Sequence, residues 1–220
     1  LLLHHQAFLD KFLGDGLMAM FGIPLPQHDD ANRACLAALE IQEAVQKQKN
    51  GSPVLFFHHC RIGLHSGKMV VGNIGTRKRM EYTAIGDTVN VAARLEGINK
   101  EYGTSIVMSE TVFEKVSNEM ICRELDFVML KGKENVTCLY ELLGKKNSVS
   151  KETETLVSEY QQGLSYYREK NFSESVKLFT SLQQKYPYDK PTQILLQRSS
   201  EYLITPPHEN WNRAFELKTK

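Results

Sequence analysis

Short apolar runs separated by turn residues open the chain. Residues 11–15 and 17–21 flank an Asp-Gly pair, and such a pair between apolar runs predicts a tight hairpin. From Asp29 or Asp30, apolar residues recur at every third or fourth position. This spacing predicts a helix that closes in the polar stretch 46–52.

The alternation of strands and helices continues through the middle of the chain. Residues 56–64 and 68–74 predict a second hairpin that turns at Ser66-Gly67. The elements predicted after it are a strand over 82–85, a helix capped by Asp87 or Thr88 and ending near Gly103, a strand over 105–108, a helix from Ser109, and strands over 122–130 and 137–143. This mixed order predicts an α+β domain, an α/β sandwich, over residues 1–144.

Beyond this domain the pattern becomes purely helical. Residues 145–155 are polar and charged, show no apolar periodicity and predict a linker. Residues 156–220 predict a helical tail with the residue order of a tetratricopeptide-type helix pair, carried by Gly163, Tyr166, Tyr167, Phe172, Ser175, Phe179 and Pro187. An ordinary helical hairpin explains these residues equally well. Because one repeat does not bury its apolar face alone, we expect the tail to pack on the first domain or on another chain.

The composition and net charge of the chain limit the partners that it is expected to bind. The 220 residues are 41% hydrophobic, which is enough for one buried core and an appendage. The 27 basic and 26 acidic residues leave a formal net charge of +1, so nothing indicates a nucleic-acid surface or contact with an anionic membrane. The four isolated cysteines suit neither a metal site nor a disulfide scaffold and indicate a reducing compartment.

The first residues carry no start signal. Leu1 runs directly into the next element, and the chain shows neither a signal peptide nor an apolar stretch long enough to span a membrane. We therefore expect a chain that begins inside a domain and lies in the cytoplasm. An upstream sensor or membrane anchor is compatible with this expectation.

Two polar residues of the first predicted hairpin are candidates for phosphate chemistry. Asp15 could hold a hard cation such as Mg²⁺, although aspartate is also a common choice for turn geometry. Lys11 lies two and four residues before Leu13 and Asp15, so on an extended strand the three share a face. Taken alone, Lys11 is explained at least as well as an ordinary surface lysine.

Asn90 and Arg94 form a second candidate pair. They stand four residues apart on one face of the predicted helix, away from the apolar stripe of Val91, Leu95 and Ile98. A solvated polar face also explains this spacing. Asparagine is a poor helix former, however, which favours a functional role for Asn90.

A family signature is carried by three segments of the sequence. These are 61–67 (RIGLHSG), 71–75 (VGNIG) and 81–94 (EYTAIGDTVNVAAR). In this order they resemble the core of the class III adenylyl and guanylyl cyclases. The resemblance runs from about residue 8 to residue 143 and implies the ferredoxin-like nucleotidyl cyclase fold without its first strand. In the family that strand carries a second metal-binding aspartate and the loop around the triphosphate, and Asp10 lies in the wrong place to replace that aspartate.

The resemblance implies a role for each candidate. The implied roles are a metal ligand for Asp15, a ribose contact for Asn90, stabilisation of the α-phosphate for Arg94, and a contact with the terminal phosphates for Lys131 or its neighbour Lys133. Lys11 and Thr83 match the two base-reading places. Family guanylyl cyclases typically carry Glu and Cys there, whereas a lysine facing adenine N1 and a hydroxyl near the exocyclic amine suit ATP.

The resemblance therefore predicts an adenylate cyclase that converts ATP into 3′,5′-cyclic AMP and pyrophosphate. It implies two Mg²⁺ or Mn²⁺ ions per site and a homodimer in which Asp15 of one chain meets the nucleotide-binding residues of the other. This chain alone is expected to be inactive, because it lacks the second metal-binding aspartate. The alternatives are a guanylate cyclase, a non-catalytic module that binds a partner or nucleotide through a cyclase-like scaffold, and an adaptor that acts through its tail.

Overall fold

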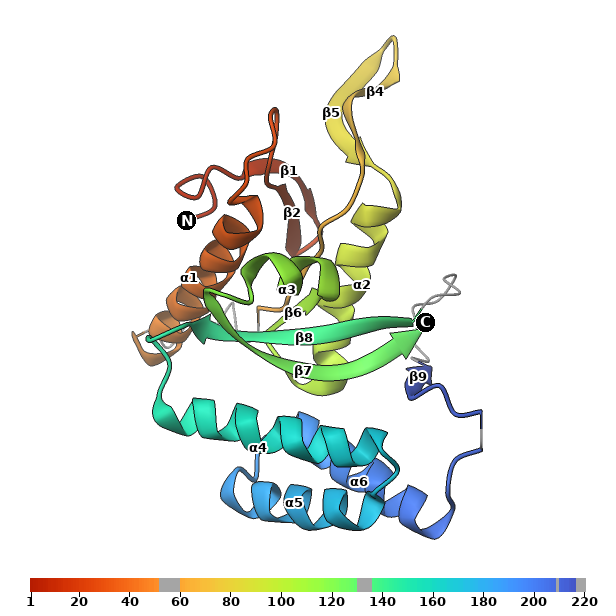
Figure 1. Cartoon of the computed structure of the whole chain (residues 1–220). Coiled ribbons are helices and arrows are strands. Elements are labelled where there is room, and N and C mark those ends of the chain that lie inside the picture. The colour runs from red at the N-terminus through yellow and green to blue at the C-terminus, as the bar shows by residue number, and fades with distance from the viewer. Residues whose placement is uncertain (52–59, 130–135, 209, 217–220) are drawn as a thin grey trace.

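The computed structural model describes residues 1–51, 60–129, 136–208 and 210–216. Its elements follow the chain in the order β1 (Phe8–Leu13), β2 (Gly16–Met20), α1 (Asp30–Gly51), β3 (Ile62–Leu64), β4 (Val70–Thr76), β5 (Arg79–Ile85), α2 (Asp87–Tyr102), β6 (Ile106–Ser109), α3 (Glu110–Val116), β7 (Met120–Met129), β8 (Val136–Lys145), α4 (Lys151–Arg168), α5 (Phe172–Lys185), α6 (Lys190–Ile204) and β9 (Ala214–Glu216). Figure 1 shows α1, α2 and α3 around the largest sheet, with the tail helices α4, α5 and α6 below it. None of the helices in the described segments is long and apolar enough to cross a lipid bilayer.

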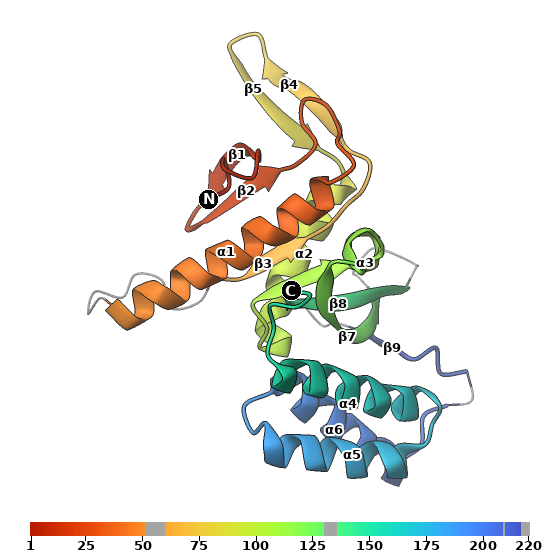
Figure 2. The same cartoon turned by 60° about the vertical axis from the view of Figure 1, so that its left-hand side comes forward.

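A five-stranded sheet forms the centre of the first domain. Its strand order is β3-β6-β8-β7-β9, with β3 parallel to β6 and β9 parallel to β7. Side chains alternate between its faces: Ile106 and Met108 of β6 pack with α1 and α3, whereas Val107 packs with α2. Both faces are therefore covered by helices, which confirms the predicted α/β sandwich (Figure 2).

The first predicted hairpin is present and begins earlier than the pattern indicates. Strands β1 and β2 pair antiparallel around a loop of Gly14 and Asp15. Gly14 has a φ of 64°, a left-handed conformation that tight hairpin loops commonly place on glycine. Because β1 ends at Leu13, Asp15 lies in the loop, and the expectation that it shares an extended strand with Lys11 is wrong.

The second predicted hairpin, 56–64 with 68–74, is wrong. Residues 56–59 lie outside the described part of the chain; the end of that segment forms β3, which pairs with β6, while β4 pairs with β5. A Cβ at Gly63 would lie 2.3 Å from the backbone oxygen of Ala92, so β3 is held on the main sheet by a close approach of α2 that only glycine permits. The β4–β5 hairpin extends away from the domain (Figure 1).

Helix α2 begins slightly earlier than predicted. Gly86, rather than Asp87 or Thr88, occupies the N-cap position. The Thr88 hydroxyl donates instead to the backbone oxygen of Lys68 at 2.6 Å, and it thereby fastens the link between β3 and β4 to the helix. The buried residues of α2 are Val91, Leu95, Ile98, Asn99 and Tyr102, which confirms the predicted apolar stripe.

The tail packs on the first domain, one of the two outcomes expected from its sequence. Its own core consists of Tyr160, Leu164, Tyr167, Phe172, Phe179, Leu182 and Leu195. The Tyr160 hydroxyl reaches out of this core and donates to the backbone oxygen of Leu125 on β7 at 3.3 Å. The chain then returns to the sheet as β9, a strand that the sequence pattern did not indicate.

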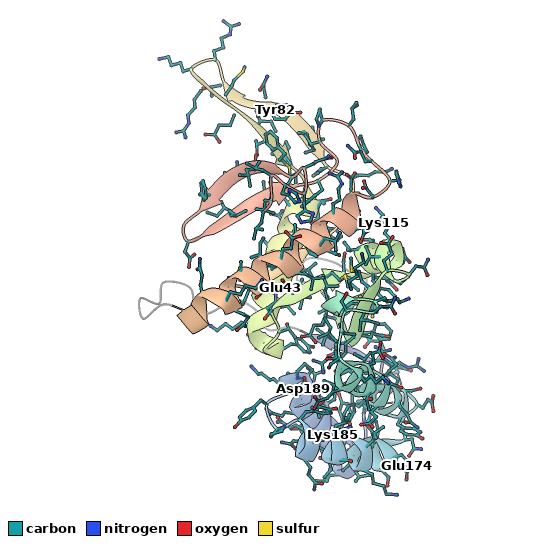
Figure 3. The ribbon with its side chains drawn as sticks, turned by 90° about the vertical axis from the view of Figure 1, so that its left-hand side faces the viewer. Glu43, Tyr82, Lys115, Glu174, Lys185 and Asp189 are labelled. Atoms are coloured by element: carbon teal, nitrogen blue, oxygen red, sulfur yellow. The ribbon has the colours of Figure 1, made fainter. Side chains whose placement is uncertain are left out.

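Buried charges join the tail to the sheet. The side chain of Arg123 on β7 is 3% exposed and lies between Glu141 of β8, at 2.6 Å, and Asp189 of the tail, at 2.8 Å. Burial alone would lower the pKa of the Arg123 guanidinium, but the two carboxylates outweigh burial and raise that pKa above its ordinary value. Arg198 of α6 pairs in the same way with Asp126 of β7. Figure 3 shows Asp189 at the point where the tail meets the first domain.

Replacing Asp189 by asparagine should lower the free energy of unfolding by about 2 kcal/mol, because Arg123 keeps its buried charge and loses one partner. Asparagine preserves the N-cap bond that residue 189 accepts from the backbone N–H of Thr192, so the change reports charge rather than capping. The matched control is Glu174→Gln, which disrupts an exposed pair with Lys177 and should cost under about 0.5 kcal/mol. Urea unfolding measures both variants, and equal losses would show that the buried pair does not stabilise the docked tail.

Candidate functional site

Two hairpins bring Lys11 and Thr83 together. Lys11 lies on β1 and Thr83 lies on β5, and both side chains approach Asp10. The Thr83 hydroxyl donates to Asp10 Oδ2 at 2.9 Å, and the Lys11 ammonium lies 3.6 Å from the same oxygen. Glu81 Oε2 lies 3.8 Å from that ammonium. The two residues that the family resemblance assigns to base reading are therefore neighbours within one chain.

A bulge in β1 permits this arrangement. Leu9 pairs with Ala19 and Lys11 pairs with Met18, so Asp10 is an extra residue in the strand. In a regular strand, successive side chains point to opposite faces of the sheet. The bulge removes this restriction and lets Asp10 and Lys11 approach the same residue of β5.

Aromatic packing holds the two hairpins against each other. Phe8 of β1 and Tyr82 of β5 meet edge to face, with ring centroids 5.5 Å apart. Figure 3 shows Tyr82 on the β4–β5 hairpin. Thr83, the next residue, is only 6% exposed, so its hydroxyl is confined to the junction between the hairpins.

The residues expected to contact the ribose and phosphates lie on α2 or outside the described chain. Asn90 and Arg94 are both exposed on α2, on the side away from its buried stripe. Within the described residues neither side chain makes a hydrogen bond or an ion pair, so both are available to a ligand. Lys131 and Lys133 lie in 130–135, outside the described residues, and their assignment stays a prediction.

Asp15 does not form a complete metal site with its neighbours. It is exposed in the loop of the β1–β2 hairpin. Across residues 1–51, 60–129, 136–208 and 210–216, no three His, Cys, Asp or Glu side chains gather closely enough to hold a metal ion. Mg²⁺ takes oxygen ligands in octahedral geometry, so the single carboxylate of Asp15 does not fit the ion by itself.

A cavity of about 960 Å³ borders the junction of the hairpins. Tyr82 is among its lining residues, together with Met18, Met20, Leu64, His65, Thr88 and Lys115. Figure 3 labels Lys115, which donates to the Ser66 hydroxyl at 2.7 Å on the rim of this space. The cavity reaches the β4–β5 hairpin at Tyr82, but neither Lys11 nor Thr83 lines it.

The position of Asp10 does not follow from the sequence pattern. The family resemblance gives Asp10 no role, because it lies in the wrong place to replace the metal-binding aspartate. The structure places the Asp10 carboxylate between Lys11 and Thr83 instead. The adjacent Asp-Lys pair was the one available signal, but a bulge has no pattern of its own in the sequence.

The cysteines offer no reactive nucleophile. All four are free, and burial raises the pKa of the Cys35 and Cys122 thiols to about 12. Burial also raises the pKa of Cys60 and Cys138 above the ordinary value. Thiols that stay protonated near neutral pH are poor nucleophiles, so the chemistry of the site rests on its charged and hydroxyl groups.

Comparison with known proteins identifies the family. Residues 4–144 match the family described as the adenylate and guanylate cyclase catalytic domain. Over 151 residues the chain is 36% identical to adenylate cyclase 1 of Rhizobium meliloti (strain 1021), covering 66% of this chain and 22% of that protein. Over 205 residues it is 31% identical to the terminal-differentiation-specific adenylate cyclase of Dictyostelium discoideum, covering 90% of this chain and 10% of that protein, so this match extends into the tail.

The fold agrees with this family. The crystal structure of the adenylyl cyclase CyaB from P. aeruginosa matches with a TM-score of 0.58 and 26% sequence identity, covering 68% of this chain and 78% of that one. The chain therefore belongs to the adenylate and guanylate cyclase catalytic domain family and carries a helical tail after that domain. It spans less than a quarter of the length of the two curated relatives. Because the family includes cyclases of both bases, membership alone does not decide between ATP and GTP.

Proposed function

We propose that this chain supplies the nucleotide-binding part of an adenylate cyclase. In the reaction, the ribose 3′-hydroxyl of ATP gives up its proton to solvent and attacks the α-phosphorus, forming the new O–P bond of 3′,5′-cyclic AMP. The bond from the α-phosphorus to the bridging oxygen breaks, and pyrophosphate leaves with that electron pair. The observation that carries the proposal is the contact of Lys11 and Thr83 with one carboxylate at the junction of two hairpins.

Lys11 and Thr83 read the base in this proposal. The Lys11 ammonium donates to N1 of adenine, which is an acceptor. The Thr83 hydroxyl faces the 6-amino group. Guanine carries a proton on N1 and an oxygen at position 6, so the same pair suits it poorly.

Asn90 and Arg94 act on the sugar and the reacting phosphate. Asn90 orients the ribose so that its 3′-hydroxyl lines up with the α-phosphorus. The guanidinium of Arg94 presents several N–H donors to the charge that builds on the phosphoryl oxygens. Their exposure on one face of α2 is consistent with a shared ligand. Lys131 is assigned to the terminal phosphates on the family resemblance.

A second copy of the domain completes the site in this proposal. Large apolar side chains on the two hairpins are exposed, and they include Phe12, Val70, Met80 and Ile85. Exposed apolar surface of this kind marks contact surfaces between proteins. A two-fold homodimer would bring Asp15 of one chain to the nucleotide held by the other. Two Mg²⁺ or Mn²⁺ ions would supply further charge stabilisation there, with Asp15 as one ligand.

A non-catalytic nucleotide-binding or partner-binding module is the second candidate. The observation that favours it is the lone carboxylate of Asp15 among the described residues, which leaves a metal site incomplete. The two candidates share the base-reading pair and differ in turnover. Both predict ATP binding, and only the first predicts cyclic AMP.

The double change Lys11→Glu with Thr83→Cys should lower kcat/KM for ATP about tenfold or more and raise the relative use of GTP, because it exchanges the hydrogen-bonding groups that face the base. The assay uses an extended chain, in which a first strand and aspartate of the family type are joined before Leu1. Lys151→Glu with Thr155→Cys makes the same exchanges on the exposed start of α4 and serves as the control. An unchanged preference for ATP in the first variant would refute the base-reading assignment.

A further inference from the structure

The Thr83 hydroxyl is held by a buried acceptor. The Asp10 side chain is 1% exposed, and its Oδ2 accepts the Thr83 hydroxyl proton at 2.9 Å. A threonine hydroxyl has one proton to donate and two lone pairs that accept. Once that proton is committed to Asp10, the hydroxyl presents only lone pairs to anything else that approaches it.

The second carboxylate oxygen of Asp10 is evidence that a ligand binds here. Asp10 Oδ1 is buried and has no hydrogen-bond partner among the described residues. Buried carboxylate oxygens are normally paired, because an unpaired one carries a desolvation penalty. The junction of the hairpins therefore offers two unmet acceptors, Thr83 Oγ1 and Asp10 Oδ1, and no free hydroxyl donor.

We propose that Asp10 is a positioning residue that fixes the Thr83 hydroxyl as an acceptor and thereby selects purine nucleotides with a 6-amino group over those with a 6-oxo group. This inference rests on the proposed function, in which Thr83 faces position 6 of the base. A 6-amino group donates two N–H bonds and meets the acceptors. A 6-oxo group brings a lone pair against a lone pair, and a hydroxyl that is free to rotate would tolerate it.

Asp10 also contacts Lys11, and this contact suggests a simpler role that the test must separate. The Lys11 ammonium lies 3.6 Å from Asp10 and 3.8 Å from Glu81, so either carboxylate could serve merely as its counter-ion. Glu81 makes no hydrogen bond to Thr83 and its side chain is 49% exposed, whereas Asp10 touches both base-reading residues. Glu81→Ala is therefore the matched control for Asp10→Ala, because each removes one carboxylate beside Lys11.

The test measures binding of ATP and ITP to the whole 220-residue chain by displacement of a fluorescent ribose-labelled ATP. ITP differs from ATP in carrying the 6-oxo group and a proton on N1, and it lacks the additional 2-amino group of GTP. The parent chain should bind ATP about tenfold more tightly than ITP. Asp10→Ala removes the acceptor and should lower the ratio of the ITP dissociation constant to the ATP dissociation constant about threefold or more, whereas Glu81→Ala should leave that ratio unchanged. Part of the preference for ATP should remain, because Lys11 still faces the N1 proton of ITP.

Two threonine variants keep the test decisive if Asp10→Ala does not fold, as judged by thermal unfolding. Thr83→Val keeps the shape and removes the hydroxyl, so it should lower the ratio by a similar factor. Thr83→Ser keeps the hydroxyl and should retain the preference. Asp10→Ala added to Thr83→Val should have no further effect on the ratio, because the two residues act through one hydrogen bond.

The outcomes separate this inference from the proposed function. A ratio that falls in Asp10→Ala and is kept in Glu81→Ala supports the inference. An unchanged ratio in Asp10→Ala, or in Thr83→Val, overturns the inference and leaves the proposed function standing. An equal fall in Asp10→Ala and Glu81→Ala reduces Asp10 to a counter-ion. A parent chain that binds neither nucleotide, or prefers ITP, overturns the proposed base preference and this inference with it.

Discussion

Replacing Arg94 by alanine in the extended chain should lower kcat for cyclic AMP formation about a hundredfold while KM for ATP changes little. The physical reason is the position of charge during the reaction. Negative charge grows on the α-phosphoryl oxygens only as the 3′-oxygen attacks and pyrophosphate leaves, so a guanidinium placed there binds the transition state more strongly than the substrate. Arg94 is exposed on α2 and pairs with no carboxylate among the described residues, which leaves its charge available for that task.

Lys100→Ala is the matched control for the arginine. Lys100 is an exposed cation in the last turn of the same helix, and its removal tests the general effect of losing positive charge from α2. We expect less than about a twofold change in kcat for this variant, because surface charges at a distance are screened. A rise in KM without a fall in kcat for Arg94→Ala would assign the arginine to substrate binding instead.

The 220-residue chain by itself should produce essentially no cyclic AMP from ATP with Mn²⁺. Asp15 is the carboxylate assigned to the metal, and no cluster of three ligands forms around it or elsewhere in the described residues. A lone carboxylate binds such ions weakly, because the ion keeps its waters in preference to a single protein ligand. Each site of a symmetric dimer has the same deficiency, so dimerisation alone does not repair it.

The control for this prediction is nucleotide binding. Lys11, Thr83 and Asn90, which are assigned to the base and the ribose under the proposal, are present in the chain, so ATP should still bind even where turnover is absent. Clear cyclic AMP production by the 220-residue chain would contradict the metal argument. Loss of ATP binding as well as turnover would contradict the assignment of the nucleotide site itself.

The sequence predicted those elements whose signals are local. The β1–β2 hairpin follows from its Asp-Gly pair, and α2 follows from the spacing of Val91, Leu95 and Ile98. The pairing of β3 was missed because the Ser66-Gly67 turn looks the same whether the flanking strands pair or separate. The close contact of Gly63 with α2 and the parallel pairing with β6 decide the outcome, and both are long-range. Strand β9 was missed for the same reason, since three residues carry no alternation and pair with a distant edge strand.

The residues of the candidate site also differ in whether sequence motifs or long-range strand pairing determine their placement. The family resemblance assigns Lys11 and Thr83 to base reading, which stays a prediction, and the structure brings the two residues together from different hairpins. The contact of Asp10 with Lys11 and Thr83 could not be predicted, because it depends on the register shift between Leu9 and Lys11 in the paired strand. Periodicity therefore indicates which residues face a core or a ligand, whereas hydrogen-bond direction between side chains requires the folded arrangement.

Under the proposal, this chain contributes the nucleotide-binding residues of a two-chain cyclase site. The measurement that tests it most directly is cyclic AMP formation from a mixture of the 220-residue chain and the extended chain carrying Arg94→Ala, with each component assayed alone and heterodimers verified by size and mass. The variant supplies the first strand and its aspartate, and the 220-residue chain supplies Lys11, Thr83, Asn90 and Arg94. We predict little activity from either component alone and clear activity from the mixture. A mixture that stays silent despite verified heterodimers would contradict the assignment of these roles to this chain.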